Sequence, residues 1–129
     1  MSNQRRDVRF NFESHPIEGM FSIYKMHEEI IDSKPARMYL QDLSAGGLRF
    51  STRLDIPLSE DVMYCFTFQT LQTPFKLYGC IQRKEKEGSR YYYGVKLVHS
   101  DKQMRLKIIQ IVNRLAINRR KRERLIKGR

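Results

Sequence analysis

The sequence is poor in the residues that build covalent cross-links, metal sites or membrane spans. Only two of its 129 residues are cysteines, Cys65 and Cys80, and neither has a second Cys or a His pair nearby. We therefore expect reduced core thiols rather than a disulfide or a zinc site. The longest uninterrupted apolar run, Val62 to Phe66, falls far short of the roughly 20 residues that cross a bilayer. The N-terminal residues are charged with no apolar stretch behind them, so we expect no signal peptide and predict a cytoplasmic protein.

Residues suited to catalysis are also few and scattered. The three histidines, His15, His27 and His99, are far apart in the sequence, and none lies in a nucleophile pattern with Ser or Cys. Paired carboxylates and metal-ligand spacings are absent from the sequence as well. The sequence therefore predicts a protein that is not an enzyme, with no catalytic residues, no metal site and no cofactor.

Positive charge is abundant but unevenly placed. The formal net charge is +11. Residues 119–129 hold seven basic residues and one acidic residue, a net +6, whereas residues 1–118 hold 18 basic and 13 acidic residues, a net +5. A uniformly basic surface would favour a nucleic-acid binder, whereas this distribution indicates a modestly charged domain with a basic tail. The tail is interpreted either as a solvated helix end that aids solubility or as a contact for nucleic acid or an anionic surface.

Short segments with period-two alternation predict a β domain. Polar, Gly or Pro residues separate these segments, and the connecting loops have lengths typical of those between antiparallel neighbouring strands. Six strands are enough to close a small barrel, and we expect a mainly β fold with a six-stranded antiparallel barrel. The expected strands are Gly19–Met26, Ala36–Leu40, Gly47–Thr52, Val62–Phe68, Phe75–Gln82 and Tyr91–Val98.

After Val98 the periodicity changes to that of a long C-terminal helix. Ser100 and Gln103 have the spacing of a capping box, which predicts a helix start near Asp101, and Gly128 is a natural stop. We expect the packing face to end near Ile117 and the far end to project from the domain. A helix used for self-association is the alternative. The apolar residues that recur on one helix face are Met104, Ile108, Ile111, Val112 and Leu115.

Two short motifs carry most of the functional information. Asp42 to Gly47 forms a D-x-S-x-x-G pattern in a predicted loop, and Arg5 to Arg9 forms R-x-x-x-R just before the first strand. Taken alone, the first is compatible with an ordinary turn. The second recurs elsewhere in this arginine-rich chain, so spacing alone does not single it out. The order of the elements along the chain singles these motifs out. The arginine motif comes first, followed by the loop motif, a Tyr-x-Gly-Val-x-Leu strand and a terminal helix.

This ordered set resembles the PilZ domain, a bacterial receptor module for the second messenger cyclic di-GMP. The resemblance implies a six-stranded antiparallel barrel with a helix, and a dinucleotide bound on the outside of the barrel. It divides the chain into an N-terminal arm (1–17), the barrel (18–99) and a C-terminal helix with a basic tail (100–129). It also implies that cyclic di-GMP is the ligand and that a downstream protein is the partner.

The resemblance assigns ligand-binding roles to six residues. Arg5 and Arg9, with Arg6 between them, would grip guanine and phosphate, because a guanidinium donates two parallel hydrogen bonds and stacks on bases. Asp42 and Ser44 would read guanine edges and support the phosphate. The chain departs from the common pattern in carrying an acidic residue inside the arginine motif. The sixth residue is Gly47, which would leave room for the ligand.

The arm has few apolar residues, so we expect it to be mobile when empty and ordered by the ligand. The alternative functions come from other classes. A PilZ-like adaptor would bind a protein without the nucleotide, and a basic-tail binder would hold nucleic acid or an anionic surface through residues 119–129.

Overall fold

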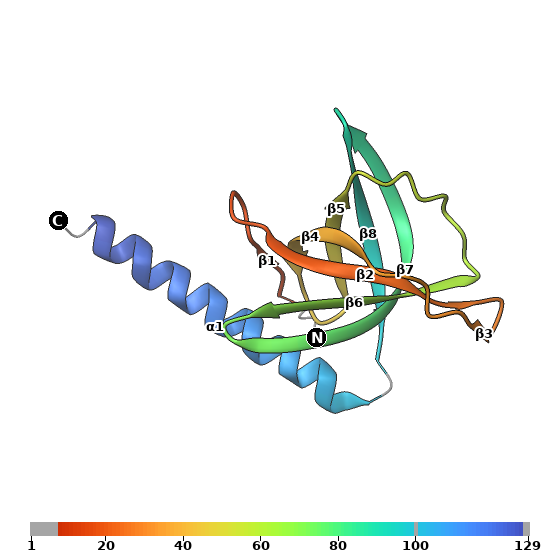
Figure 1. Ribbon diagram of the computed structural model, residues 1–129. Coiled ribbons are helices and arrows are strands. Elements are labelled where there is room, and N and C mark those ends of the chain that lie inside the picture. The colour runs from red at the N-terminus through yellow and green to blue at the C-terminus, as the bar shows by residue number, and fades with distance from the viewer. Residues whose placement is uncertain (1–7, 100, 128–129) are drawn as a thin grey trace, which may run out of the picture.

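The computed structural model describes residues 8–99 and 101–127, which form strands followed by one helix (Figure 1). The element order along the chain is β1 (Phe10–Asn11), β2 (Ile17–Met26), β3 (Glu29–Ile30), β4 (Ala36–Leu43), β5 (Gly47–Thr52), β6 (Val62–Thr70), β7 (Thr73–Glu87), β8 (Arg90–Val98) and α1 (Lys102–Lys127).

Six of the strands close into an antiparallel barrel. The sheet order is β1-β4-β5-β8-β7-β6-β2-β3, and an additional pairing of β4 with β2 closes the ring. The short strands β1 and β3 extend the sheet beside β4 and β2. The six barrel strands are those expected from the alternation, so the predicted fold class is confirmed. Two-residue strands are too short for alternation to reveal them.

Aromatic side chains fill the barrel. Phe50 lies 5.2 Å from the rings of Phe21, Phe66 and Tyr93, measured between ring centroids. On β8, Tyr93 is buried whereas Tyr92 lies on the outer face. Side chains thus alternate between the two faces of this strand, and the inner rings form the core.

Helix α1 covers the barrel with the face that its periodicity predicts. Ile108, Ile111 and Val112 are buried in the same core as the barrel rings. The helix starts at the expected place, but its observed cap is the Asp101 carboxylate, which accepts a hydrogen bond from the backbone N–H of Met104 at 3.0 Å. Ser100 and Gly128, named above as start and stop signals, lie outside the described residues.

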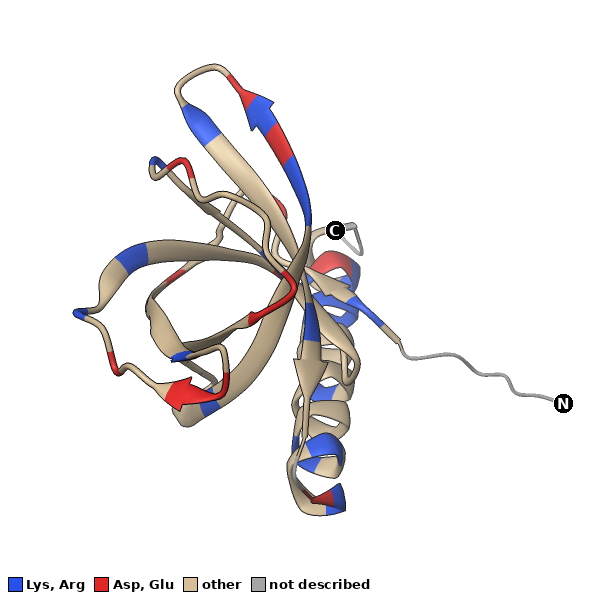
Figure 2. Cartoon of the chain, turned by 90° about the vertical axis from the view of Figure 1, so that its right-hand side faces the viewer, with Lys and Arg blue, Asp and Glu red and all other residues tan. Residues whose placement is uncertain are grey.

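The helix continues well past the barrel (Figure 1). Its 26 residues correspond to about 39 Å of helix. Lys and Arg follow one another along it, and Glu123 is its one acidic residue (Figure 2). Among the described residues, no helix is both long enough and apolar enough to span a membrane.

The N-terminal arm is more firmly attached than the sequence suggested. Phe10 and Phe12 are buried, and Phe10 pairs with Leu43 across β1 and β4. Arg119 of α1 lies over the Phe10 ring, 4.1 Å from its centroid, and forms an ion pair with Glu13 at 3.3 Å. Two buried phenylalanines thus pack residues 10–13 against the domain, and the mobility of the arm without ligand stays a prediction. The helix also keeps contact with the domain as far as Arg119, slightly beyond the predicted limit.

Tyr93 provides a test of the core. Its hydroxyl donates to the carbonyl of Leu54 and accepts from the N–H of Ile56, each at 2.7 Å, so it holds the loop after β5 to the barrel. Tyr93→Phe should lower the free energy of unfolding by about 1–3 kcal/mol, because two backbone groups lose their partner. Urea unfolding measures this, with Tyr24→Phe, whose hydroxyl has no hydrogen bond among the described residues, as the control. Equal unfolding midpoints for the two variants would contradict the assignment.

Candidate functional site

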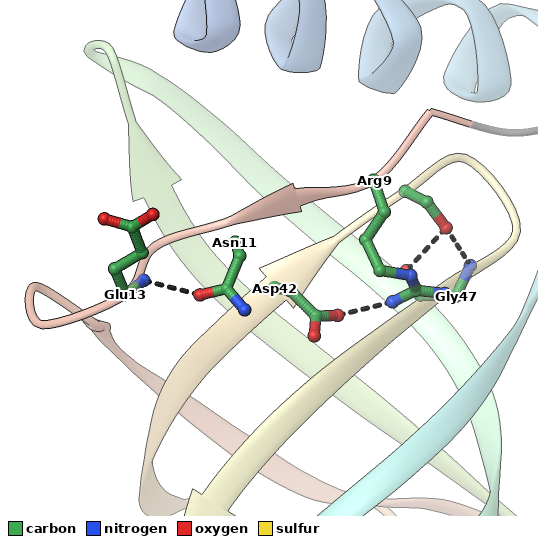
Figure 3. Close-up of polar contacts among 6 residues, drawn as sticks. Arg9, Asn11, Glu13, Asp42 and Gly47 are labelled. Atoms are coloured by element: carbon green, nitrogen blue, oxygen red, sulfur yellow. Dashed lines mark hydrogen bonds and ion pairs between the residues drawn. The ribbon is translucent and has the colours of Figure 1, made fainter. Parts of the chain in front are cut away.

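The candidate site is a hollow on the outside of the barrel, over β4, β5, β8 and β7. Its volume is about 440 Å³. The N-terminal arm crosses one side of it, and the turn between β4 and β5 forms an edge (Figure 3). The side chains and backbone that line it belong to Arg9, Asp42, Gly46, Gly47, Leu48, Arg49, Gln82, Arg83, Glu85, Tyr92, Gly94, Val95 and Lys96.

A β-bulge turns Asp42 toward this hollow. Leu40 points into the barrel, so regular alternation would also bury Asp42 among the core rings. The register between β4 and β5 shifts between these two residues. An extra residue reverses the side-chain direction beyond the bulge. Leu43 therefore takes the inward position, where it is fully buried, and the Asp42 carboxylate lies on the outer face.

A second bulge acts in the same way on β7. Ile81 points into the core opposite Val95, and the register shifts between Ile81 and Arg83. Arg83 then pairs with Gly94 and lies on the outer face, where it lines the hollow. Two irregularities in the barrel thus direct one acidic and one basic side chain into the same hollow.

Arg9 reaches across from the arm to Asp42 (Figure 3). One terminal nitrogen of its guanidinium donates a hydrogen bond to Asp42 Oδ1, and the two side chains form an ion pair. Asp42 is only 7% exposed, whereas the Arg9 side chain is 50% exposed. A buried carboxylate needs such a partner. The exposed part of the guanidinium keeps donors for a further acceptor.

Gly47 makes this close packing possible. A Cβ atom at this position would lie 2.7 Å from the carbonyl oxygen of Val95 and 3.5 Å from the Arg9 guanidinium. The first distance is shorter than side chains tolerate against backbone, so only glycine lets β5 and β8 pair here.

Ser44 shapes the turn between β4 and β5. Its hydroxyl accepts from the N–H of Gly47 and donates to the carbonyl of the same residue, both at 3.2 Å. The side chain is almost completely buried. At the other side of the turn, His99 Nε2 donates to the carbonyl of Ala45 at 2.6 Å. The hydroxyl of Ser44 is therefore engaged within the turn, and the backbone of the turn faces the hollow.

The structure brings Arg9, Asp42 and Gly47 together as the motifs predict, with Ser44 directly behind them. Arg5 and Arg6 lie outside the described residues.

Two residues that sequence reasoning missed complete the site. Tyr92 lies on the outer face of β8, and the guanidinium of Arg49 is 4.8 Å from its ring centroid. Arg49 also contacts Glu85 at 3.4 Å. Period-two alternation that turns Tyr91 and Tyr93 inward turns Tyr92 outward, and the cross-strand position of Arg49 beside it was the signal that could have revealed the pair.

Metal binding has no support here. Among the described residues, no group of three or more His, Cys, Asp or Glu side chains could hold a metal ion. The arrangement is suited instead to a flat, anionic ligand: arginines supply forked donors, a carboxylate supplies an acceptor, and a tyrosine ring supplies a stacking surface.

Comparison with known families gives one match over most of the chain. The sequence pattern of the PilZ domain matches residues 3–114. No curated protein gives a significant match.

Several solved structures share the fold. The YcgR protein of Escherichia coli in complex with c-di-GMP has 15% identity and a TM-score of 0.69, over 98% of this chain and 51% of that one. The K. pneumonia MrkH complex with c-di-GMP has 15% identity and a TM-score of 0.67, over 94% of this chain and 55% of that one. The PilZ domain of E. coli YcgR with c-di-GMP has 21% identity and a TM-score of 0.61, over 97% and 99%. The chain thus spans about half the length of the first two proteins. At these identities the likeness establishes the fold.

Gly47→Ala tests the close approach that shapes the site. The added methyl group should force β5 away from β8 and lower the free energy of unfolding by about 1–3 kcal/mol. Gly94→Ala is the matched control, because its Cβ would meet Arg83 Cβ at 3.4 Å, an ordinary contact. Thermal or urea unfolding of both variants measures the difference. If Gly47→Ala were as stable as Gly94→Ala, the steric argument would fail.

Proposed function

The chain belongs to the PilZ domain family, and from this premise we propose that it is a cyclic di-GMP receptor without enzymatic activity that passes the signal to a protein partner. The observation that carries the proposal is the Arg9–Asp42 pair over Gly47, on the wall of a hollow of about 440 Å³. Two segments far apart in the sequence supply these residues, the arm and the motif from Asp42 to Gly47.

The donors and acceptors suit this ligand. Cyclic di-GMP carries two phosphates and two guanines. Arg9 can donate two parallel hydrogen bonds to a phosphate or to guanine O6 and N7. Asp42 can accept from the guanine N1–H and N2–H edge, a pair of donors that adenine does not present. A carboxylate at this position therefore favours guanine over adenine.

Binding requires a change at the ion pair. Asp42 is nearly buried and one of its oxygens is bound to Arg9. In our proposal the Arg9 guanidinium shifts toward the ligand, and the ligand takes over part of the contact with Asp42. The bound guanine then compensates the buried carboxylate, so that its charge is not left unpaired.

Other residues on the outer face of the barrel add contacts to the proposed ligand. Tyr92, already stacked with Arg49, offers a ring for a guanine, and cation–π contact strengthens such stacking. Arg83 and Lys96 have no ion pair among the described residues and face the hollow, where they can meet phosphate. We propose that Arg5 and Arg6 close over the ligand from the arm and that Ser44 acts by fixing the turn backbone.

The route to a partner runs through the arm. Arg9 directly precedes Phe10, which is buried and lies under Arg119 of α1. Glu13 contacts the same arginine. A shift of Arg9 toward the ligand therefore strains a segment that is attached to both β4 and the helix. We propose that this alters the arm and helix surface that a downstream protein recognises.

An enzymatic role has no support in the side chains near the hollow. Histidine does not line it. Away from the hollow, on β6, burial raises the pKa of the Cys65 thiol above its ordinary value, which disfavours the reactive thiolate. We propose a receptor that acts in the cytoplasm, needs no cofactor and responds only by binding.

Substitutions at the ion pair test the proposal by calorimetric titration with cyclic di-GMP. Arg9→Ala should weaken binding about 30-fold or more, because charge-assisted hydrogen bonds are lost. Arg9→Lys keeps the charge but loses the fork, so it should also weaken binding strongly. Asp42→Ala should reduce affinity and the preference for guanine over adenine in the corresponding cyclic dinucleotides.

Arg114→Gln serves as the matched control, because it removes one arginine from an exposed position on α1. It should leave the dissociation constant unchanged. Absence of saturable binding to the intact protein would disprove the proposed function, and so would undiminished binding by Arg9→Ala and Asp42→Ala.

A further inference from the structure

The outer face of the barrel continues beyond the proposed dinucleotide site as a second basic groove. Tyr92 lines both the site and the next hollow, of about 440 Å³. Tyr39 and Arg90 line that hollow and a third one, of about 450 Å³, which also contains Arg37 and Arg53. Because neighbouring hollows share lining residues, they lie next to one another in a row across β4, β5 and β8, which we call the track. We call the part lined by Arg37, Tyr39, Arg53 and Arg90 the Tyr39 groove.

Strand register sets the spacing of the two rings along this track. Tyr39 pairs with Ser51 across β4 and β5, and Ser51 pairs with Tyr92 across β5 and β8. The two tyrosines therefore stand on either side of a small, buried serine. Gln41 donates to the Ser51 hydroxyl at 2.9 Å and adds a polar surface between them.

An arginine guanidinium lies over each of the two tyrosine rings. The guanidinium of Arg90 lies 5.0 Å from the centroid of Tyr39, as that of Arg49 lies 4.8 Å from the centroid of Tyr92. The arrangement of a ring with a guanidinium thus occurs twice on one face. Stacking on aromatic rings and guanidinium planes is the means by which proteins hold unpaired bases.

The groove also carries cations that the protein itself does not neutralise. Arg53 and Arg90 have no ion pair in the part of the chain that the structure describes. Arg37 pairs with Glu18 at 2.9 Å, but both side chains are more than half exposed, so this pair is weak. Along the whole track the lining has seven basic residues against three acidic ones, a net +4.

We propose that this track binds single-stranded nucleic acid, with bases on Tyr39 and Tyr92 and phosphates on the arginines. A linear polymer fits three adjacent hollows in a row, which follow about 20 Å of β5. A duplex would keep its bases stacked on each other and leave the two rings unused. A purely anionic surface would need the arginines but not the tyrosines.

The strand and the dinucleotide would share one end of the track. Arg49 and Tyr92 belong to the dinucleotide site proposed above, whereas the Tyr39 groove lies outside it. Cyclic di-GMP should therefore weaken strand binding by competition. Only this part of the inference rests on the proposed function, because strand binding itself is measured without the dinucleotide.

Fluorescence anisotropy of the full chain with a labelled oligodeoxythymidine at low salt tests the inference. Tyr39→Ala should weaken binding about fivefold or more, through loss of one stacking surface. The double variant Arg53→Gln/Arg90→Gln should weaken it further and make the slope of log K against log salt shallower by about 1.4, for two phosphate contacts. Arg53 is exposed and unpaired among the described residues, so its replacement should not disturb folding.

Two controls distinguish binding in the Tyr39 groove from general attraction to the positive charge of the protein. Arg114→Gln, away from the groove, should bind like the unaltered chain. A variant with Gln in place of Arg120, Lys121, Arg122 and Arg124 should lose less than the double variant in the groove, although it lacks more charge. The inference is overturned if the helix variant loses binding while the groove variants keep it. Equal affinity for a duplex of the same length, or no binding by the unaltered chain, would also overturn it.

Discussion

The buried carboxylate of Asp42 is the constraint on which the site depends. A charge removed from water requires a partner of opposite sign, and Arg9 of the N-terminal arm supplies it. The requirement brings the arm over the turn between β4 and β5, where Gly47 leaves room for the guanidinium. Phe10 and Phe12, which follow Arg9, then bury their rings and hold the arm in place. One ion pair thus joins the arginine motif of the N-terminal arm to the motif in the turn between β4 and β5.

Much of this architecture could be read from the sequence because it rests on periodic burial. The six barrel strands alternate, and α1 repeats its apolar residues at helical spacing, so each was predicted near its place. The predicted ends of two strands were wrong, because β4 runs to Leu43 and β7 runs to Glu87, beyond the expected Leu40 and Gln82. The motif residues were found through their order along the chain. The two bulges were not predicted, because a register shift depends on the pairing of two distant strands. Asp42 at an apparently inward position was the available hint.

Other features escaped prediction because they arise from tertiary contacts. The anchoring of the arm depends on Arg119, more than 100 residues away in the sequence. The stacking of Arg49 on Tyr92 depends on the register between β5 and β8. In both cases the local sequence predicts the secondary-structure element, whereas the contact depends on a partner strand or helix. The helix cap differs, because it is a local contact that falls to Asp101, one residue beyond the expected capping residue.

The basic residues behind the net charge of +11 gather in three parts of the protein. One hollow is surrounded by Arg9, Arg49 and Arg83, another is lined by Arg37, Arg53 and Arg90, and a long basic helix extends from the barrel.

The most direct test of the central claim is to titrate cyclic di-GMP into the isotope-labelled protein and follow the backbone amide signals by NMR. The account predicts saturable shifts at Arg9, at the turn from Asp42 to Gly47, and at Tyr92. Shifts confined to other surfaces, or none, would contradict it.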